Sequence, residues 1–238
     1  MPIEMHELVE QLTPTNTVLI FGAGASMPSG APSVADLIRD ISEKFKIEPD
    51  GLSLAEIAAV AEIRRNRTDL VALIRQRFNG LKAKGSLLNL PRHEWKSIYT
   101  TNYDELVEDA YRRAGNQLQV FTSDFDFKVQ SNPTATKYFK IHGTISKDLV
   151  DGVVSNMTLT QMDYDATADY REALYARLRS DMNPGSQVVV IGQSLNDAHL
   201  RNLVETVIAT NQKVGAGGKI FFLLYEKNEN RALLYEQR

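Results

Sequence analysis

Residues 17–30 read Thr-Val-Leu-Ile-Phe-Gly-Ala-Gly-Ala-Ser-Met-Pro-Ser-Gly, and this stretch sets the expected fold class. The continuous apolar run at 18–21 is typical of a strand that is buried on both faces of a parallel sheet. Glycines follow at once, at positions 22 and 24. Glycine allows a tight turn and a close approach of a ligand, and such a turn points backbone N–H groups at one place. The stretch therefore predicts a diphosphate-binding turn or a tight turn without a ligand.

The match to a dinucleotide-binding fingerprint is incomplete. That fingerprint has a third small residue at the start of a helix and an acidic residue about 20 positions further on. Here Met27 and Pro28 interrupt the expected helix start, and Asp40 and Glu43 fall inside a helical pattern rather than at a strand end. The nucleotide interpretation therefore depends on other parts of the chain.

The composition limits the possible function classes. The chain has 238 residues, of which 43% are hydrophobic, and a net charge of −3. That charge gives no indication of direct binding to nucleic acid or to an anionic membrane. The absence of cysteine excludes disulfides, thiol nucleophiles and cysteine-ligated zinc.

No stretch of the sequence has the pattern of a membrane span or of a secretory signal. A membrane helix needs about 20 apolar residues, and no run approaches that length. The first 12 residues lack a basic region followed by an apolar core. We therefore expect a soluble, cytoplasmic protein. Because the chain ends inside a helical pattern, we also expect residues 1–238 to form one domain, the N-terminal part of a longer protein.

Strand and helix patterns alternate along the chain. The predicted strands are 18–21, 95–100, 118–122, 137–141, 187–191 and 220–225. The predicted helices are 34–45, 53–64, 68–79, one from about 103, one or two within 161–181, and one after 194. This alternation predicts a Rossmann-like, doubly wound parallel α/β sheet of about six strands with helices on both faces. We expect a helical insertion at about 46–92, whose arginines (64, 65, 67, 75 and 77) form a solvated face.

Four of the predicted strands end in polar or glycine-rich segments. These segments are Gly22–Ser26, Thr101–Asp104, His142–Gly143 and Gly192–Ser194. In open α/β sheets, ligands bind beyond the carboxyl ends of the strands. We therefore expect the four segments to face one crevice.

Several polar side chains in these segments have two possible roles. His142 could accept a proton from water or a ribose hydroxyl, or it could be a hydrogen-bonded core histidine. Asn102 could hold a water or a ribose hydroxyl, or it could cap the helix that follows. Asp104 could bind a ribose or stabilise the first helical turn. Ser194 and Asn196 could bind a second ribose, or Asn196 could cap the next helix.

In their order, the four segments resemble the sirtuin family. Sirtuins carry a glycine-alanine-glycine-x-serine loop, a threonine-glutamine-asparagine-isoleucine-aspartate segment and a histidine-glycine pair, and the resemblance spans about three quarters of this chain. It implies that Asn102 and Asp104 flank the nicotinamide ribose of NAD and that His142 is the general base. The predicted cofactor-binding residues are Gly22, Ala23, Gly24, Ala25, Ser26, Thr101, Gly192, Ser194 and Asn196.

The chain also departs from the pattern of protein-deacylating sirtuins. Those enzymes usually carry a four-cysteine zinc module after the histidine, whereas this chain has no cysteine and only about 20 residues between His142 and the next predicted helix. Position 101 is threonine instead of glutamine, and the loop after Ser26 lacks a phenylalanine-arginine pair. The chain looks more like the zinc-free sirtuin-like domains of bacterial anti-phage systems.

That closer resemblance implies an NAD⁺ glycohydrolase that uses NAD as its substrate and needs no metal. It also implies an effector that depletes NAD⁺ in anti-phage defence, acts as a homo-oligomer and works with a fused or separate sensor module. The alternatives are an NAD-dependent protein deacylase or ADP-ribosyltransferase, a non-catalytic sensor of NAD or ADP-ribose, and a scaffold with an empty crevice.

Overall fold

Six parallel strands form one sheet. The computed structural model describes residues 3–149, 156–166, 169–183, 185–193, 198–213 and 219–223. The strand order is β3-β4-β2-β1-β5-β6, and every pairing is parallel. The strands are β1 (Thr17–Phe21), β2 (Ser97–Thr100), β3 (Leu118–Phe121), β4 (Thr136–Lys140), β5 (Gln187–Ile191) and β6 (Lys219–Leu223). The predicted six-stranded parallel sheet is confirmed.

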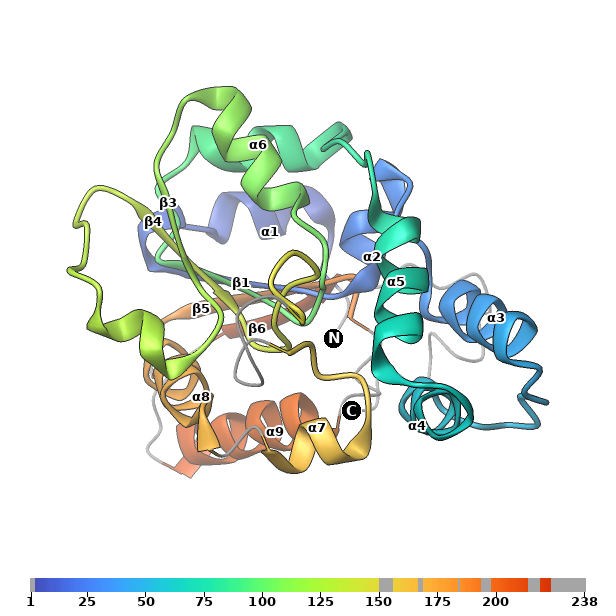
Figure 1. Ribbon diagram of the computed structural model, residues 1–238. Coiled ribbons are helices and arrows are strands. Elements are labelled where there is room, and N and C mark those ends of the chain that lie inside the picture. The colour runs from blue at the N-terminus through green and yellow to red at the C-terminus, as the bar shows by residue number, and fades with distance from the viewer. Residues whose placement is uncertain are drawn as a thin grey trace.

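Helices cover both faces of this sheet. Helix α6 (Leu106–Ala114) and the 3₁₀ helix η3 (Gly85–Arg92) pack on one face, and α8 (Glu172–Asp181) and α9 (Ala198–Lys213) pack on the other (Figure 1). Successive strand residues point to opposite faces. In β1, Val18 and Ile20 lie in the core under α8 and α9, while Leu19 belongs to the core under α6. A strand buried on both sides needs an apolar residue at every position, which is why β1 reads as a continuous apolar run.

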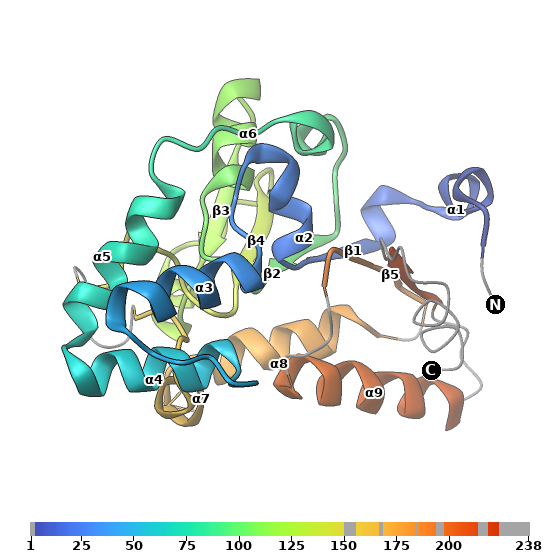
Figure 2. The same cartoon turned by 90° about the vertical axis from the view of Figure 1, so that its right-hand side faces the viewer.

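Three helices form a separate group beside the sheet. Helices α3 (Val34–Phe45), α4 (Leu54–Arg64) and α5 (Arg67–Phe78) pack into their own apolar cluster (Figures 1 and 2). Ile145 and Met157, from the chain that follows β4, are part of that cluster. The helical group therefore packs beside the carboxyl edge of the sheet. Two of its helices, α4 and α5, lie within the predicted insertion at 46–92.

Short local interactions begin these helices. Ser33 and Asp36 form a capping box at the start of α3, in which the Asp36 N–H donates to Ser33 Oγ at 3.1 Å and the Ser33 N–H donates to Asp36 Oδ2 at 3.0 Å. Ser53 and Glu56 form the same arrangement before α4. Such boxes satisfy backbone donors that the first helical turn leaves open.

The remaining elements are short. They are α1 (Met5–Gln11), η1 (Pro14–Asn16), α2 (Ala23–Ser26), η2 (Met27–Ser29), η4 (Asp124–Lys128) and α7 (Gln161–Ala166). The helical pattern at 161–181 corresponds to two helices, α7 and α8. Among the described residues, the structure contains no helix with the length and apolar character that a membrane span requires.

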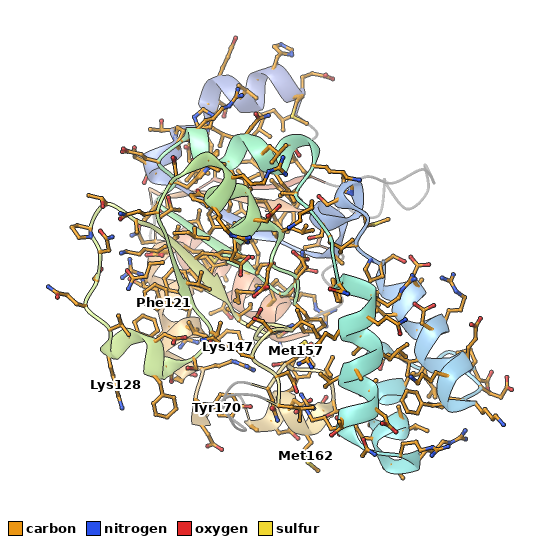
Figure 3. The ribbon with its side chains drawn as sticks, turned by 45° about the horizontal axis from the view of Figure 1, so that its top comes forward. Phe121, Lys128, Lys147, Met157, Met162 and Tyr170 are labelled. Atoms are coloured by element: carbon orange, nitrogen blue, oxygen red, sulfur yellow. The ribbon has the colours of Figure 1, made fainter. Side chains whose placement is uncertain are left out.

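The expectation that the arginines of the insertion form a solvated face is wrong for Arg67. Its side chain is only 16% exposed, and its guanidinium contacts Asp148 at 2.9 Å and Asp163 at 3.0 Å. The guanidinium also donates to the backbone carbonyl of Met157 at 2.7 Å. Met157 lies beside α5 (Figure 3). Arg67 points inward because the segment after β4 packs against α5. The buried carboxylate of Asp148 and the carbonyl of Met157, both in that segment, need hydrogen-bond donors.

Candidate functional site at the carboxyl edge of the sheet

The four polar segments follow four strands that are neighbours in the sheet. The strands are consecutive in the order β4-β2-β1-β5, and all run in the same direction. The register places Phe21 opposite both Thr100 and Ile191, and Thr100 opposite Lys140. The four segments therefore leave the sheet at one edge and at one level. With about 4.8 Å between strands, the four strand ends span roughly 14 Å.

The segment after β1 forms a short helix rather than an open turn. Helix α2 begins at Ala23, directly after β1, and η2 continues it to Ser29. Met27 and Pro28 thus follow a helical turn that has already formed. Proline is tolerated at the start of η2 because the first N–H groups of a helix have no intrahelical partner.

Glycines pack the segment after β1 against the segment after β5. The Gly24 N–H donates to the Gly192 carbonyl at 2.9 Å. A Cβ atom on Gly24 would lie 2.8 Å from Gly192 Cα, and one on Gly22 would lie 2.6 Å from Gln193 Cα. Gly192 itself has a φ of +66°. The sequence interpretation left open a ligand-binding turn or a tight turn without a ligand, and the structure shows that backbone-to-backbone packing requires these glycines.

Three backbone N–H groups of this segment donate to protein carbonyls. Gly22 donates to Ile191 at 3.0 Å, Gly24 to Gly192, and Ala25 to Gly22 at 3.0 Å. A diphosphate at this position would therefore use the other N–H groups of the segment, or it would displace the carbonyl of Gly192 from Gly24.

Ser26, Asn102 and Asp104 form a directed hydrogen-bond cluster. Ser26 Oγ donates to Asp104 Oδ2 at 2.7 Å. Asn102 Nδ2 donates to Ser26 Oγ at 3.0 Å and to the Gly22 carbonyl at 2.9 Å. An ionised carboxylate can only accept, so the serine donates to Asp104 and accepts from Asn102. The segments after β1 and β2 are thereby joined through their side chains.

The cluster also settles which of the alternative structural roles these residues have. Asn102 does not cap the helix, because α6 begins at Leu106 and the Asn102 amide is directed at Ser26. Asp104 precedes the first turn, and its Oδ1 accepts from the Leu106 N–H at 3.0 Å. Both N–H groups of the Asn102 amide have acceptors, so its carbonyl oxygen, Oδ1, is the atom of the amide that can accept from a ligand.

A glutamine links the segments after β2 and β5. Gln193 is buried, and its Nε2 donates to Thr101 Oγ1 at 3.1 Å. This contact crosses the end of β1, which lies between the two strands. The sequence interpretation placed Gln193 in a site segment but gave it no role. Ser194 and Asn196 lie outside the described residues.

His142 is buried just after β4. The residue is 4% exposed, and its ring contacts the ring of Tyr164 edge-to-face, with 5.3 Å between the centroids. Its backbone carbonyl accepts from the Thr158 N–H at 3.0 Å. His142 therefore lies at the same edge of the sheet as Gly22, two strands away, as the sequence interpretation requires.

The glycine that follows His142 makes room for a buried arginine. Gly143 has a φ of +77°, and a Cβ atom there would lie 2.8 Å from Arg171 Nη2. Arg171 has no exposed surface and donates to the Thr122 carbonyl at 3.1 Å and to Thr158 Oγ1 at 2.7 Å. Burial lowers the pKa of its guanidinium. Sequence patterns gave no indication of this residue, because nothing in its own segment marks it as buried.

Two surface hollows lie near the site, and one of them touches the polar cluster at Asp104. A hollow of about 330 Å³ reaches Asp104 from the side of the helical group, where Phe78 and Ile145 line it. A hollow of about 640 Å³ lies further along α6, between Lys82 and Arg112. Neither is lined by Asn102 or His142.

A six-stranded parallel sheet with helices on both faces defines a doubly wound α/β protein. Within that class, the family model of the SIR2-like domain matches residues 96–238, and the chain belongs to this family. The sirtuin resemblance inferred from the four segments is thereby confirmed.

Solved sirtuin structures have the same fold. One, described as "The Structural basis of Sirtuin Substrate Affinity", has a TM-score of 0.55 at 15% identity and covers 92% of this chain and 87% of its own. Another, "Structure of Sir2Tm bound to a propionylated peptide", has a TM-score of 0.52 at 16% identity and covers 95% and 89%. At such identities the likeness concerns the fold alone.

Curated relatives come from bacteria. NAD(+) hydrolase ThsA of Cytobacillus dafuensis is 22% identical over an alignment of 241 positions that covers 98% of this chain and 46% of the relative. NAD(+) hydrolase ThsA of Enterococcus faecium is 25% identical over an alignment of 215 positions that covers 86% of this chain and 43% of the relative. Defense-associated sirtuin 2 of Bacillus subtilis is 27% identical over an alignment of 141 positions that covers 58% of this chain and 13% of the relative. The chain spans less than half the length of these relatives.

Proposed function

We propose that this protein is an NAD⁺ glycohydrolase that cleaves the nicotinamide–ribose bond to give nicotinamide and ADP-ribose. The observation that carries the proposal is the Asn102–Ser26–Asp104 cluster, which lies at the same sheet edge as His142 in a SIR2-family fold. The names of the ThsA relatives, NAD(+) hydrolase, support the hydrolysis of NAD⁺.

The chemistry of NAD⁺ cleavage makes modest demands on a protein. Nicotinamide leaves as a neutral molecule from a cationic ring, so no strong acid is needed. The transition state has oxocarbenium character on the ribose, as in other glycosyl cleavages. The site must orient the ribose, favour positive charge on it and admit water to one face.

In this proposal, each side chain has a part in that reaction. Asn102 Oδ1 accepts a hydrogen bond from the attacking water or from a ribose hydroxyl. Asp104 fixes Ser26 and thereby the Asn102 amide, and its carboxylate favours the developing ribose cation. Water bonds to the ribose carbon, its proton passes to His142, and the electrons of the broken bond leave with nicotinamide.

Binding of NAD⁺ is assigned to the flanking segments. Gly22, Ala23, Gly24, Ala25 and Ser26 would contact the diphosphate, with Thr101 and Gly192 beside them. Ser194 and Asn196 stay predicted contacts for the second ribose. Gln193 joins this set because it holds Thr101 in place.

The biological setting is part of the same proposal. The relatives include a protein named for defence, Defense-associated sirtuin 2. We infer an effector that depletes NAD⁺ in anti-phage defence, in the cytoplasm, as a homo-oligomer coupled to a sensor module. The chain would then be one domain of a longer protein.

The test is to incubate the purified protein with NAD⁺ and to resolve nicotinamide, ADP-ribose and cyclic ADP-ribose. We expect nicotinamide and ADP-ribose in equal amounts. Asn102→Ala and His142→Ala should each lower the rate by roughly 10²–10⁴-fold while circular dichroism shows an intact fold. Near-normal rates in both variants would remove these assignments.

Two further assays distinguish this function from a protein deacylase and from a sensor of NAD. If acyl-ADP-ribose forms when an acyl-lysine peptide is added, the protein is a deacylase. Thermal stabilisation by NAD⁺ without nicotinamide release would indicate a sensor module.

A further inference from the structure

A lysine is buried at the end of β4, close to the site. Lys140 is the last residue of this strand, which lies between β2 and β3, and its side chain has no exposed surface. Lysine is almost never fully buried unless it is paired, because its ammonium loses strong hydration. The partners of Lys140 therefore indicate what it does.

The ammonium group of Lys140 has three partners for its three N–H bonds. It donates to the backbone carbonyl of Asp104, to Glu108 Oε1 at 2.9 Å and to Thr144 Oγ1 at 2.9 Å. All of its hydrogen-bonding capacity is thus used inside the protein.

Two of these partners belong to the two halves of the candidate site, and the third, Glu108, lies on α6. Asp104 lies in the segment after β2, which also carries Asn102. Thr144 lies in the segment after β4, two residues beyond His142. A backbone hydrogen bond, from the Ile145 N–H to the Tyr103 carbonyl at 3.0 Å, joins the same two segments. Lys140 therefore holds the Asn102 side of the site against the His142 side.

A buried ion pair of this kind is weak evidence for a role in stability. The second carboxylate oxygen of Glu108, Oε2, is buried without a hydrogen-bond partner within the part of the chain that the structure describes. Burial raises the pKa of Glu108, against the opposing effect of Lys140. Apolar residues of similar size often replace such a buried ion pair with no loss of stability. A charged pair at this place therefore points to a role in geometry.

We propose that Lys140 is a positioning residue for NAD⁺ cleavage. By binding the Asp104 carbonyl and Thr144 Oγ1, its ammonium fixes the distance from Asn102 and Asp104 to His142. This inference rests on the proposed function. A displacement of about 1 Å in a catalytic group can lower the rate about 10²-fold. Loss of the Lys140 contacts therefore lowers kcat more than it changes KM.

The test is the double variant Lys140→Met/Glu108→Leu, which replaces both charges with apolar side chains. We expect the double variant to fold, with a thermal midpoint lower by about 2–12 °C because the Asp104 carbonyl loses its donor. We also expect kcat to fall by about 10²-fold with little change in KM. The matched control, Glu108→Gln, retains all three hydrogen bonds of Lys140 and should retain wild-type kcat. Wild-type kcat in the double variant would overturn the proposal and leave the proposed function intact.

Two further measurements keep the inference testable. If the double variant fails to fold, Thr144→Val removes one contact of the ammonium with little change of shape, and the same fall in kcat without a change in KM is expected. If the wild type releases no nicotinamide, the proposed function fails. Crystal structures of the wild type and the double variant then decide the role of Lys140. A shift of residues 101–104 relative to 142–145 supports it, and unchanged positions overturn it.

Discussion

Ser26 and Asp104 are joined by a 2.7 Å hydrogen bond, although 78 positions separate them in the chain. Both side chains are buried. The bond directs the serine hydroxyl at the carboxylate and therefore presents its oxygen to the Asn102 amide. The orientation of Asn102 thus depends on a residue of another segment, and this relationship leads to the first prediction.

Ser26→Ala should lower both stability and activity. The substitution leaves Asp104 Oδ2 and one N–H of Asn102 without their partner, and a buried polar group that loses its hydrogen bond costs about 1–3 kcal/mol. We expect a loss of that size in urea unfolding, together with slower nicotinamide release.

Ser29→Ala is the matched control for this substitution. Ser29 is equally buried, and its Oγ accepts from the Lys84 N–H at 3.1 Å, away from Asn102. It should lose a similar amount of stability and keep its rate of NAD⁺ cleavage. Equal loss of activity in both variants would contradict a specific role for Ser26.

Gly192→Ala should disrupt the packing between the segments after β1 and β5. Its Cβ would collide with the backbone of Gly24 and Ala25, and its φ of +66° is strained for alanine. We expect a larger loss of stability than the roughly 1–3 kcal/mol of backbone strain alone, and weaker stabilisation by NAD⁺ in thermal unfolding.

Gly115→Ala is the control that separates the effect of backbone strain from that of a steric collision. Gly115 has a φ of +72°, and a Cβ atom there would meet no heavy atom of the described residues within 4 Å. This control should lose the stability that backbone strain costs and should retain its thermal stabilisation by NAD⁺. If Gly192→Ala proves no more harmful than Gly115→Ala, the proposed packing role is wrong.

Arg67→Met should destabilise the chain that follows His142. The substitution leaves Asp148, which has no exposed surface, without the cation that contacts it at 2.9 Å. Breaking a buried pair in this way costs about 3–5 kcal/mol. In contrast, Arg77→Met removes a partly exposed contact to Asp40 and should cost at most about 1 kcal/mol. Urea unfolding of both variants measures the difference, and similar losses would argue against a buried role for Arg67.

The stability difference between the wild type and Glu108→Gln should depend on pH. Burial raises the pKa of Glu108 above its ordinary value of 4.5, so the folded state binds its proton more tightly than the unfolded state does. Its contribution to the free energy of unfolding is therefore largest below pH 4.5 and is lost as the pH rises through the raised pKa. Glutamine does not titrate. Wild-type stability minus that of Glu108→Gln should fall over this range, and a difference independent of pH would contradict the raised pKa.

The strands could be predicted from sequence because burial on both faces makes them continuous apolar runs. The strand order could not, because it depends on packing between distant parts of the chain. Strand β4 inserts between β2 and β3, which places His142 beside the segment that carries Asn102. No local pattern in either segment encodes that insertion.

The polar segments of the site were visible in the sequence, but the residues that hold them were not. Gly22 and His142 stand out because they directly follow apolar strands. Lys140 reads as an ordinary polar residue at a strand end, and its burial depends on Glu108, 32 positions earlier. Arg67 reads as part of a solvated helix for the same reason, since Asp148 is 81 positions away. Buried charges are hidden from sequence patterns when their partners are distant.

The most direct test of the central claim is a crystal structure of the His142→Ala variant with NAD⁺, in which slow cleavage should preserve the dinucleotide. We expect the diphosphate against residues 22–26 and the nicotinamide ribose within hydrogen-bonding distance of Asn102 Oδ1. A dinucleotide bound away from the carboxyl edge of the sheet, for example in the hollow between Lys82 and Arg112, would contradict the claim.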